Sequence, residues 1–344
     1  MEQKTAFISG LPGQDAAYLA KFLLEKGYKV VGGQRRNAER SFSRLKKMGI
    51  LDKIEIVDFE LLEDSNIVDI IRKYQFDEFY NLAAQSFVGT SFKNPIYTIE
   101  VNGLSVCKML EAIRMYSPHT KFYQASTSEM FGDVKETPQS ENTPFNPVSP
   151  YGCAKLLAHT MVETYRSSYG IFACAGILFN HESPLRGDEF VTKKITNYVR
   201  EYQGDTCFTV PKRPEKPLQL GNIHSRRDFG FAGDYVEAMW LMLQQPKADT
   251  YVIATGKTCY IKDFIEMAFK EVGVTLEWRG EGLKERAIDV NTGKRVIEIS
   301  EEFYRPHDVE LLLGDAKKAN TELNWTPKHD LKALVSLMVN DQID

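Results

Sequence analysis

Short apolar runs alternate with longer amphipathic segments through the first half of the chain. Helical periodicity is clearest at 15–26, 94–115 and 150–169, and Gly27 stands where a glycine would end the first helix. The apolar runs predict strands at residues 5–9, 28–32, 54–57, 78–82, 122–126 and 171–178. Strands that alternate with helices are typical of βαβ units. The sequence therefore predicts an α/β fold with a Rossmann-type, doubly wound parallel sheet.

The pattern becomes irregular after about residue 180, with prolines at positions 184, 211, 214 and 217. We expect this part to form a smaller C-terminal domain that binds substrate and is interleaved with the sheet. Within it, residues 231–243 predict a helix, and 251–254 predict a strand that returns to the sheet. The predicted division is therefore 1–180 and 181–344, with segments around 220–255 returning to the first domain.

Composition and charge exclude several classes of protein. The 344 residues are 43% hydrophobic and 26% charged, as in globular domains, and the net charge of −4 argues against nucleic acid as the main partner. No apolar run approaches the roughly 20 residues that span a bilayer, and the first residues lack a signal-peptide pattern. We therefore expect a cytoplasmic protein with no membrane partner.

The five cysteines and six histidines show no metal-ligand spacing, so we expect no metal site. The scattered cysteines predict reduced thiols.

A glycine-containing turn, Gly10-Leu11-Pro12-Gly13-Gln14-Asp15-Ala16, joins the first predicted strand to the first helix. Glycines there permit a tight turn and the close approach of a pyrophosphate to the helix amino terminus. Ala16 stands where a third glycine is common, and it is small enough to preserve helix–strand packing. By itself the pattern also fits an ordinary strand–helix turn.

Arg35 and Arg36 follow the second predicted strand, where an NAD site more often has an acid for the ribose hydroxyls. Guanidinium groups bind phosphate with two hydrogen bonds, so the pair predicts NADP rather than NAD. Small residues that let the chain pass near the cofactor follow the fourth strand at Ala83, Ala84 and Ser86. Alternatively, the arginines begin a solvated basic face that continues through Arg40, Arg44 and Lys46.

Four residues in one short stretch suggest the chemistry. Tyr151 and Lys155 are four apart, so on a helix they share a face one turn apart. An ammonium beside a phenol favours the phenolate, lowering a pKa of about 10 toward that of a general base. Thr127 follows a predicted strand and can hydrogen-bond the same substrate oxygen, while Glu129 adds a carboxylate that a simple dehydrogenase does not need. A chance surface pair and a solvated loop acid are the alternatives, which the preceding nucleotide-binding pattern disfavours.

Several motifs together resemble the GDP-mannose 4,6-dehydratases of the extended short-chain dehydrogenase/reductase superfamily, from about residue 5 to residue 339. They are Ser126-Thr127-Ser128-Glu129-Met130-Phe131-Gly132, Ser149-Pro150-Tyr151-Gly152 with Lys155, Asn180-His181-Glu182-Ser183-Pro184, Val191-Thr192-Lys193-Lys194, Arg227-Asp228, Asp234-Tyr235-Val236-Glu237-Ala238-Met239-Trp240 and Arg305-Pro306. The combination of Thr-Ser-Glu with Asn-His-Glu-Ser-Pro is specific, because related epimerases usually lack the Glu.

The resemblance implies a lyase that converts GDP-mannose to GDP-4-keto-6-deoxymannose, the first step toward sugars of the GDP-fucose or GDP-rhamnose type. In such an enzyme Tyr151 takes the proton of the sugar 4-hydroxyl while hydride leaves C4 for NADP⁺. Lys155 lowers the pKa of the tyrosine and binds the nicotinamide ribose, and Thr127 hydrogen-bonds the 4-oxygen. Glu129 removes the C5 hydrogen, water leaves from C6, and the hydride returns to C6.

The resemblance also implies binding roles and a homodimer or homotetramer. The cofactor residues are Gly10, Gly13, Gln14, Asp15, Arg35, Arg36, Glu60, Leu61, Ala83, Ala84, Ser86, Tyr97, Lys155, His181 and Arg186. The residues for the GDP-sugar are Ser86, Asn180, Lys194, Arg227, Arg305 and Asp308. Residues 1–180 are thus expected to be the NADP-binding domain and 181–344 mainly the GDP-sugar-binding domain. The chain departs from the family pattern at Pro12, Ala16, Glu60, Arg226 and Asp308.

Other functions remain open at this point. The same dehydration could act on GDP-manno-heptose, which differs by a carbon beyond C6, or the enzyme could also reduce its 4-keto product with NADPH. A binding protein that lost turnover is disfavoured by the four intact catalytic positions, and a simple epimerase or reductase is disfavoured by Glu129.

Overall fold

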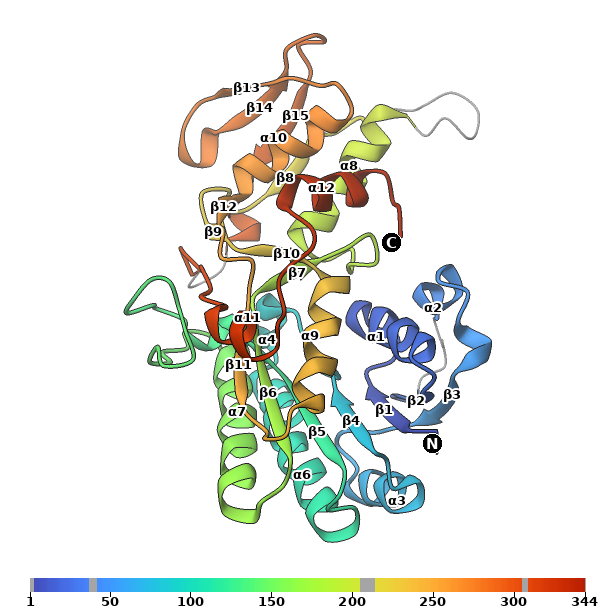
Figure 1. The fold of residues 1–344 in the computed structure, drawn as a ribbon. Helices are drawn as coiled ribbons and strands as arrows, with labels where there is room; N and C mark the ends of the chain where they lie inside the picture. The colour runs from blue at the N-terminus through green and yellow to red at the C-terminus, as the bar shows by residue number, and fades with distance from the viewer. Residues whose placement is uncertain (1–2, 37–41, 205–213, 305–308, 344) are drawn as a thin grey trace.

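A seven-stranded parallel sheet forms the centre of the computed structural model, which describes residues 3–36, 42–204, 214–304 and 309–343 (Figure 1). Its strand order is β11-β6-β5-β4-β1-β2-β3, and all six pairings are parallel. The strands are β1 (Thr5–Ser9), β2 (Lys29–Gln34), β3 (Glu55–Asp58), β4 (Glu78–Asn81), β5 (Lys121–Thr127), β6 (Ala173–Leu178) and β11 (Thr250–Ile253). The predicted Rossmann-type sheet is confirmed, including the strand that returns near residue 251.

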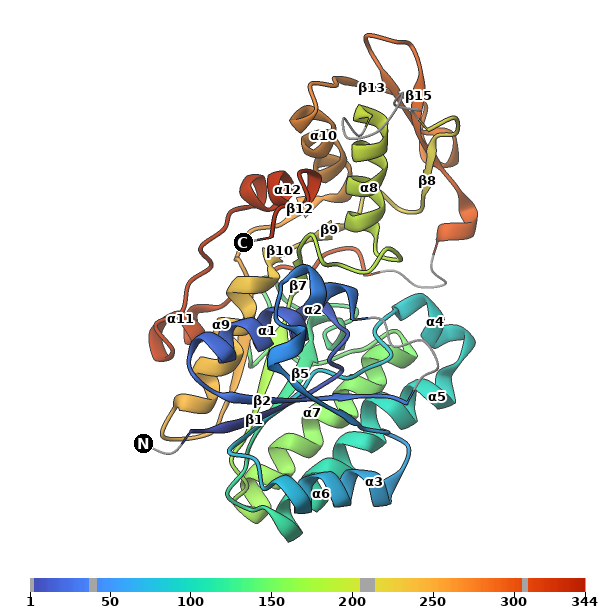
Figure 2. The same ribbon diagram turned by 90° about the vertical axis from the view of Figure 1, so that its right-hand side faces the viewer.

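Helices cover both faces of this sheet (Figure 2). One face carries α3 (Asp64–Tyr74), α6 (Ser105–Tyr116) and α7 (Pro150–Tyr169), and the other carries α1 (Gln14–Glu25) and α9 (Ala232–Gln244). Alternation along β1 explains how one strand serves both layers. Ala6 and Ile8 belong to the core under α1 and α9, whereas Phe7 belongs to the core under α3 and α6. Because both faces are covered, consecutive residues of β1 from Ala6 to Ile8 are apolar and buried.

Helix boundaries follow local signals in the sequence. The first helix ends beside Gly27, whose φ of 82° is left-handed. The single helix expected at 94–115 is divided into α5 (Pro95–Ile99), a π-helical turn at Glu100–Leu104, and α6. Two further short helices on this half of the chain are α2 (Ser43–Lys47) and α4 (Val88–Lys93).

The second half forms a separate four-stranded sheet with its own helices at one end of the molecule (Figures 1 and 2). The sheet order is β13 (Leu276–Arg279), β14 (Arg286–Asp289), β15 (Arg295–Ile299) and β8 (Leu218–Leu220). Its helices are α8 (Val191–Gln203), α10 (Ile261–Glu271) and α12 (Leu331–Val339), and α11 (Lys317–Glu322) lies beside β11. The irregular pattern of this part of the sequence did not predict these strands and helices. The domain boundary at residue 180 stays a prediction.

Two short strand pairs link the halves. They are β7 (Asn180–Glu182) with β10 (Phe229–Phe231), in parallel, and β9 (Arg226–Arg227) with β12 (Cys259–Tyr260), in antiparallel. Because β7 follows β6 directly, it carries the chain from the carboxyl edge of the large sheet into the second half. None of the helices in the described ranges is both long and apolar enough to cross a membrane.

Candidate active site

The strand β5 and the helix α7 position all four predicted catalytic residues. Ser149 caps α7, and its Oγ accepts a hydrogen bond from the backbone N of Gly152 at 3.0 Å, with Pro150 at the first helical position. Tyr151 therefore lies in the first turn of the helix, with Lys155 one turn further along. Both side chains are buried. The predicted shared helical face is confirmed.

Thr127 and Glu129 lie at the carboxyl end of β5, beside that first turn. Thr127 is the last residue of the strand, and its Oγ1 accepts a hydrogen bond from the backbone N of Glu129 at 3.2 Å. A Cβ at Gly152 would lie 2.8 Å from the backbone oxygen of Glu129, so glycine is needed for α7 to pack this closely. The charge of Glu129 and a hydrogen bond with Thr127 both act on Tyr151. The structure therefore brings the four residues together.

The pKa of Tyr151 differs from the value expected beside Lys155. Burial, and then the charge of Glu129, raise the pKa of Tyr151 to about 12 despite the hydrogen bond with Thr127. Burial also lowers the pKa of Lys155 to about 8. The Nζ of Lys155 lies 5.9 Å from the ring centroid of Tyr151 and donates to the backbone oxygen of Ala125 at 2.9 Å. The expected lowering of the tyrosine pKa is therefore wrong for the protein alone, because desolvation outweighs a lysine that is itself desolvated.

The glycine turn lies at the same edge of the sheet, against the loop that follows β4. Gly10 has a φ of 73°, and a Cβ there would lie 2.8 Å from the Cα of Ala83. The Oγ of Ser9 holds this loop by accepting hydrogen bonds from the backbone N of Leu82 and of Ala83, each at 3.0 Å. Gly10 and Ala83, two predicted cofactor residues, are thus in contact because glycine allows the two backbone segments to approach closely. Ala84 and Ser86 continue the same loop.

The amino terminus of α1 is tied to β7, 166 residues later in the chain. The Nε2 of His181 lies 2.8 Å from the Oδ2 of Asp15, and the Nε2 of Gln14 donates to the backbone oxygen of His181 at 3.1 Å. The Oγ of Ser183 donates to the Oε1 of Gln14 at 2.7 Å. The His181 ring also stacks on Tyr235, with ring centroids 4.8 Å apart. Three predicted cofactor residues therefore form one network.

Opposite charges dominate this network. Burial raises the pKa of Asp15, but the charge of His181 and hydrogen bonds from His181 and Gln14 outweigh it and bring the value to about 2. Burial lowers the pKa of His181, but Asp15 outweighs it, so this pKa is raised. Asp15 is therefore a carboxylate at neutral pH, and its charge favours the protonated form of His181.

The predicted 2′-phosphate region gathers the ends of β2 and β3 with α5. The NH1 of Arg35 donates to the hydroxyl of Tyr97 at 3.3 Å, and both side chains are exposed. The backbone N of Arg36 donates to the carboxylate of Glu60, whose own backbone N donates to Asn66. Leu61 follows Glu60 in the loop after β3. These predicted residues therefore lie around one surface at the edge of the sheet.

The predicted substrate residues are spread over the second half. Lys194 on α8 lies over the ring of Phe303, 4.8 Å from its centroid. Both line a groove of about 700 Å³, together with Tyr198, Leu218 and Gln219. Asn180 lies on β7 and the buried Arg227 on β9. Two further predicted residues, Arg305 and Asp308, lie outside the described residues.

Arg186, predicted to bind the cofactor, contacts two residues that lie four positions from it in the chain. Its Nε lies 3.1 Å from a carboxylate oxygen of the buried Glu182, and its guanidinium lies 3.6 Å from the ring centroid of Phe190. The parts of the chain that the structure describes hold no group of three or more His, Cys, Asp or Glu residues suited to a metal ion.

Comparison with known proteins identifies the family. Residues 7–338 match the family model described as GDP-mannose 4,6 dehydratase. The chain belongs to the GDP-mannose 4,6-dehydratase family. A GDP-mannose 4,6-dehydratase of Sinorhizobium fredii is 43% identical over 99% of this chain and 97% of its own length. One of Dictyostelium discoideum is 45% identical over 100% of this chain and 97% of its own.

Solved structures agree with this family's fold. A dTDP-glucose 4,6-dehydratase of Bacillus anthracis in complex with NAD has a TM-score of 0.79 at 19% identity, covering 98% of this chain and 96% of that one. A UDP-glucose 4-epimerase of Thermus thermophilus has a TM-score of 0.79 at 20% identity, covering 98% of each chain. At this level of identity the likeness shows the fold alone.

One residue that supports the site of this family member was missed in the sequence. Arg44 entered the sequence interpretation only as part of the alternative, a solvated basic face, but it donates to the backbone oxygens of Leu185 at 2.6 Å and Pro12 at 2.8 Å. It therefore joins the glycine turn to the loop after β7. A contact 141 residues away in sequence leaves no local signal. Lys46 is exposed, as that interpretation expected, and Arg40 lies outside the described residues.

Proposed function

We propose that this protein is a hydro-lyase that converts GDP-mannose to GDP-4-keto-6-deoxymannose and water, with NADP as a cofactor that stays bound. The observation that carries the proposal is the gathering of Glu129 with Thr127 and Tyr151 at the end of β5. Tyrosine and lysine suffice for oxidation of an alcohol, whereas Glu129 adds a second base that an elimination requires. The match of the relatives over nearly the full chain supports the same substrate.

The residues present fit a dinucleotide. The N-cap of the 12-residue helix α1 is Gly13, which has no side chain to occupy the first N–H groups, so those groups suit a pyrophosphate. Gly10 adds the close turn, and Arg35 suits a 2′-phosphate. When bound, oxidised NADP would supply the hydride acceptor and a positive nicotinamide ring that favours the phenolate of Tyr151.

Two side chains of the protein would each take one proton from the sugar, and both protons would be given back before the product leaves. Tyr151 as phenolate takes the proton of the 4-hydroxyl as hydride leaves C4, and Thr127 hydrogen-bonds the 4-oxygen. The new ketone acidifies the C5 hydrogen, which Glu129 removes as a proton. One of these protons would then leave with the 6-hydroxyl as water. The other would return to C5 as hydride returns to C6. The sugar would thus lose one water with no net transfer of electrons to the cofactor.

The substrate would lie between the two halves, with its nucleotide toward the groove of Lys194 and Phe303. A cation and an aromatic ring suit a phosphorylated nucleoside. Asn180 on β7 and Arg227 on β9 would bind the sugar diphosphate. The alternative GDP-manno-heptose needs room beyond C6, so comparing kcat/KM for the two GDP-sugars decides between them.

Mass spectrometry tests the reaction. Incubation with GDP-mannose should give a product lighter by one water. Glu129→Gln should abolish this product while still producing NADPH absorbance, because oxidation at C4 needs no base at C5. Glu271→Gln, at an exposed acid at the end of α10, is the control and should behave as wild type. Normal dehydration by Glu129→Gln would disprove the assigned role, and no water loss by wild-type protein would disprove the function.

Cofactor choice and assembly have their own tests. Arg35→Leu should weaken NADP binding by about tenfold or more and leave NAD binding nearly unchanged, because the lost charge pairs with the 2′-phosphate. Equal losses for both nucleotides would contradict NADP specificity.

We also propose a homodimer or homotetramer, which light scattering on the purified protein would measure.

A further inference from the structure

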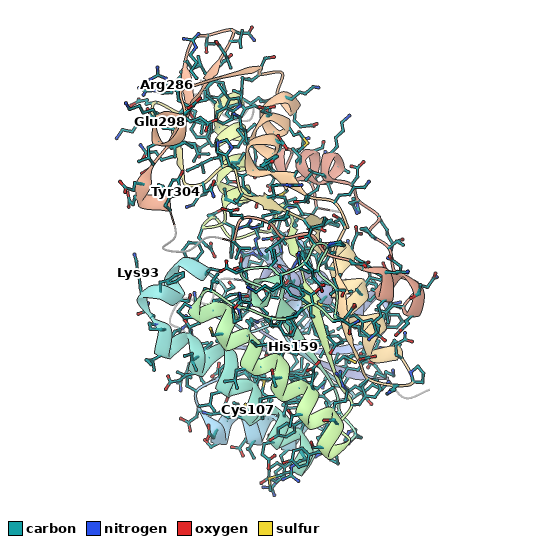
Figure 3. The ribbon with its side chains drawn as sticks, turned by 90° about the vertical axis from the view of Figure 1, so that its left-hand side faces the viewer. Lys93, Cys107, His159, Arg286, Glu298 and Tyr304 are labelled. Atoms are coloured by element: carbon teal, nitrogen blue, oxygen red, sulfur yellow. The ribbon has the colours of Figure 1, made fainter. Side chains whose placement is uncertain are left out.

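Side chains of α7 reach the last three residues of β5 at regular spacing. Tyr151 hydrogen-bonds with Thr127, and the Nζ of Lys155 donates to the backbone oxygen of Ala125. His159 lies one further turn along α7, where Figure 3 labels it. Its Nδ1 is 2.9 Å from the Oγ of Ser126. Tyr151 and Lys155 are thus followed along the helix by His159, which also contacts β5 but has no role in the chemistry.

The contact between His159 and Ser126 is buried and directed. His159 is 1% exposed and Ser126 is 3% exposed. The Nε2 of His159 lies 3.5 Å from a carboxylate oxygen of Glu163, and the hydrogen bond from His159 lowers the pKa of Glu163. A carboxylate only accepts, so Nε2 carries a hydrogen; when Nδ1 carries none, it accepts from the Ser126 hydroxyl. The Phe145 ring packs edge-on against the imidazole, with centroids 5.2 Å apart.

The strand needs this support where the chemistry occurs. On one side, β4 ends at Asn81, opposite Gln124, whereas β6 continues along the other side of β5 as far as Thr127. The segment that carries Thr127 therefore extends beyond one of its two neighbours, and contacts with α7 hold it there. A hydrogen bond between two buried groups fixes a position well, because leaving either group unpaired is costly.

We propose that His159, through Ser126, is a positioning residue that holds the end of β5 in register with Tyr151 and Lys155. This inference rests on the proposed function for its kinetic meaning, whereas the geometry that it predicts is measurable without turnover. Misplacement of reacting groups by an ångström can lower a rate by about a hundredfold without weakening binding.

Kinetics of matched variants test the proposal. His159→Phe keeps a ring but loses both nitrogens, and Ser126→Ala loses the hydroxyl. Each should lower kcat roughly ten- to hundredfold and leave KM for GDP-mannose within about twofold. His159→Asn, which can accept near the position of Nδ1, should recover most of kcat. Val162→Ala, a buried residue in the core of the same helix, should lower Tm with little change in kcat.

A measurement that needs no turnover is the rate at which a small acylating reagent modifies Lys155, followed by peptide mass spectrometry. In Ser126→Ala and His159→Phe this rate should rise several-fold relative to that of Lys193, because Lys155 is no longer held at Ala125. Unchanged labelling, unchanged kcat in Ser126→Ala, or a kcat loss in His159→Phe that Asn does not recover would each overturn the proposal. Wild-type protein that labels as expected but does not dehydrate GDP-mannose would instead overturn the proposed function.

Discussion

Two regions of the candidate site are built in opposite ways. The catalytic pair, β5 with α7, brings Thr127, Glu129, Tyr151 and Lys155 together from one strand and the helix that follows it. The nucleotide turn, residues 10–15, is instead held by contacts from β7 that lie 166 and 167 residues away. The first region depends on how β5 aligns with the helix that follows it, and the second depends on how the two halves of the chain dock.

The two regions also treat charge differently. In the catalytic pair, burial acts on Tyr151 and Lys155 in the direction of their neutral forms. In the nucleotide turn, the charges of Asp15 and His181 stabilise each other despite burial. Chemistry benefits from groups poised to exchange protons, whereas a binding turn benefits from fixed charges.

Tyr151→Phe should have the largest effect and should be confined to the catalytic pair. Loss of the hydroxyl removes the general base, so kcat should fall by about 10²- to 10⁴-fold, with the Kd for NADP within error of wild type. Stopped-flow absorbance of NADPH and titration of the cofactor measure the two quantities. If NADP binding were lost as well, the two regions would not be separable.

Gly10→Ala should have the largest effect on the nucleotide turn. The new Cβ would lie 2.8 Å from the backbone of Ala83, at a left-handed φ, so unfolding should become easier by about 2–4 kcal/mol. Gly49→Ala is the matched control, because Gly49 has a φ of 66° and nothing within 4 Å of its Cβ position, and should cost about 1 kcal/mol. Denaturant unfolding of both variants measures the difference, and equal losses would argue against a close backbone approach.

Asp15→Asn should cost about 2 kcal/mol of stability near pH 5 to 6, as a pKa lowered from 3.8 to about 2 implies. The depressed carboxyl pKa contributes stability above pH 3.8 that is lost as the pH falls toward 2. The raised histidine pKa contributes stability below pH 6.5 that is lost as the pH rises through the folded value. The difference between variant and wild type should therefore shrink at both ends of the pH range.

Thermal unfolding across this pH range tests the Asp15 prediction. Glu277→Gln breaks an exposed ion pair with Arg279 and should leave Tm unchanged throughout. A Tm difference for Asp15→Asn that stays constant from pH 3 to pH 8 would contradict the mutual stabilisation of Asp15 and His181.

Arg44→Met should have the smallest effect, about 1.5 kcal/mol, because it removes hydrogen bonds to the carbonyls of Pro12 and Leu185. The Kd for NADP should rise while kcat at saturating cofactor stays near wild type. The exposed Lys46→Met on the same helix is the control and should change stability by less than about 0.5 kcal/mol. A fall in kcat alone would place Arg44 with the catalytic pair.

Much of the fold and the catalytic pair could be predicted from local signals. Apolar runs predicted the strands, and the helix expected at 150–169 is α7 from Pro150 to Tyr169, where Ser149 and Pro150 mark its start. The second sheet could not be predicted, because short strands such as β8 have three residues and gain their pairing from β15, nearly 80 residues later. The rise in the Tyr151 pKa was also missed, because burial is set by distant packing.

The spacing of Tyr151 and Lys155 in the chain is enough to place them on one helical face. Helical periodicity and capping are local, so no distant contact is needed for them. Contacts between distant segments arise only in the folded protein: Asp15 meets His181, Arg44 joins two loops and His159 reaches Ser126. Hydrogen bonds and desolvation depend on which groups share a buried space, and distant groups come to share one only when the chain folds.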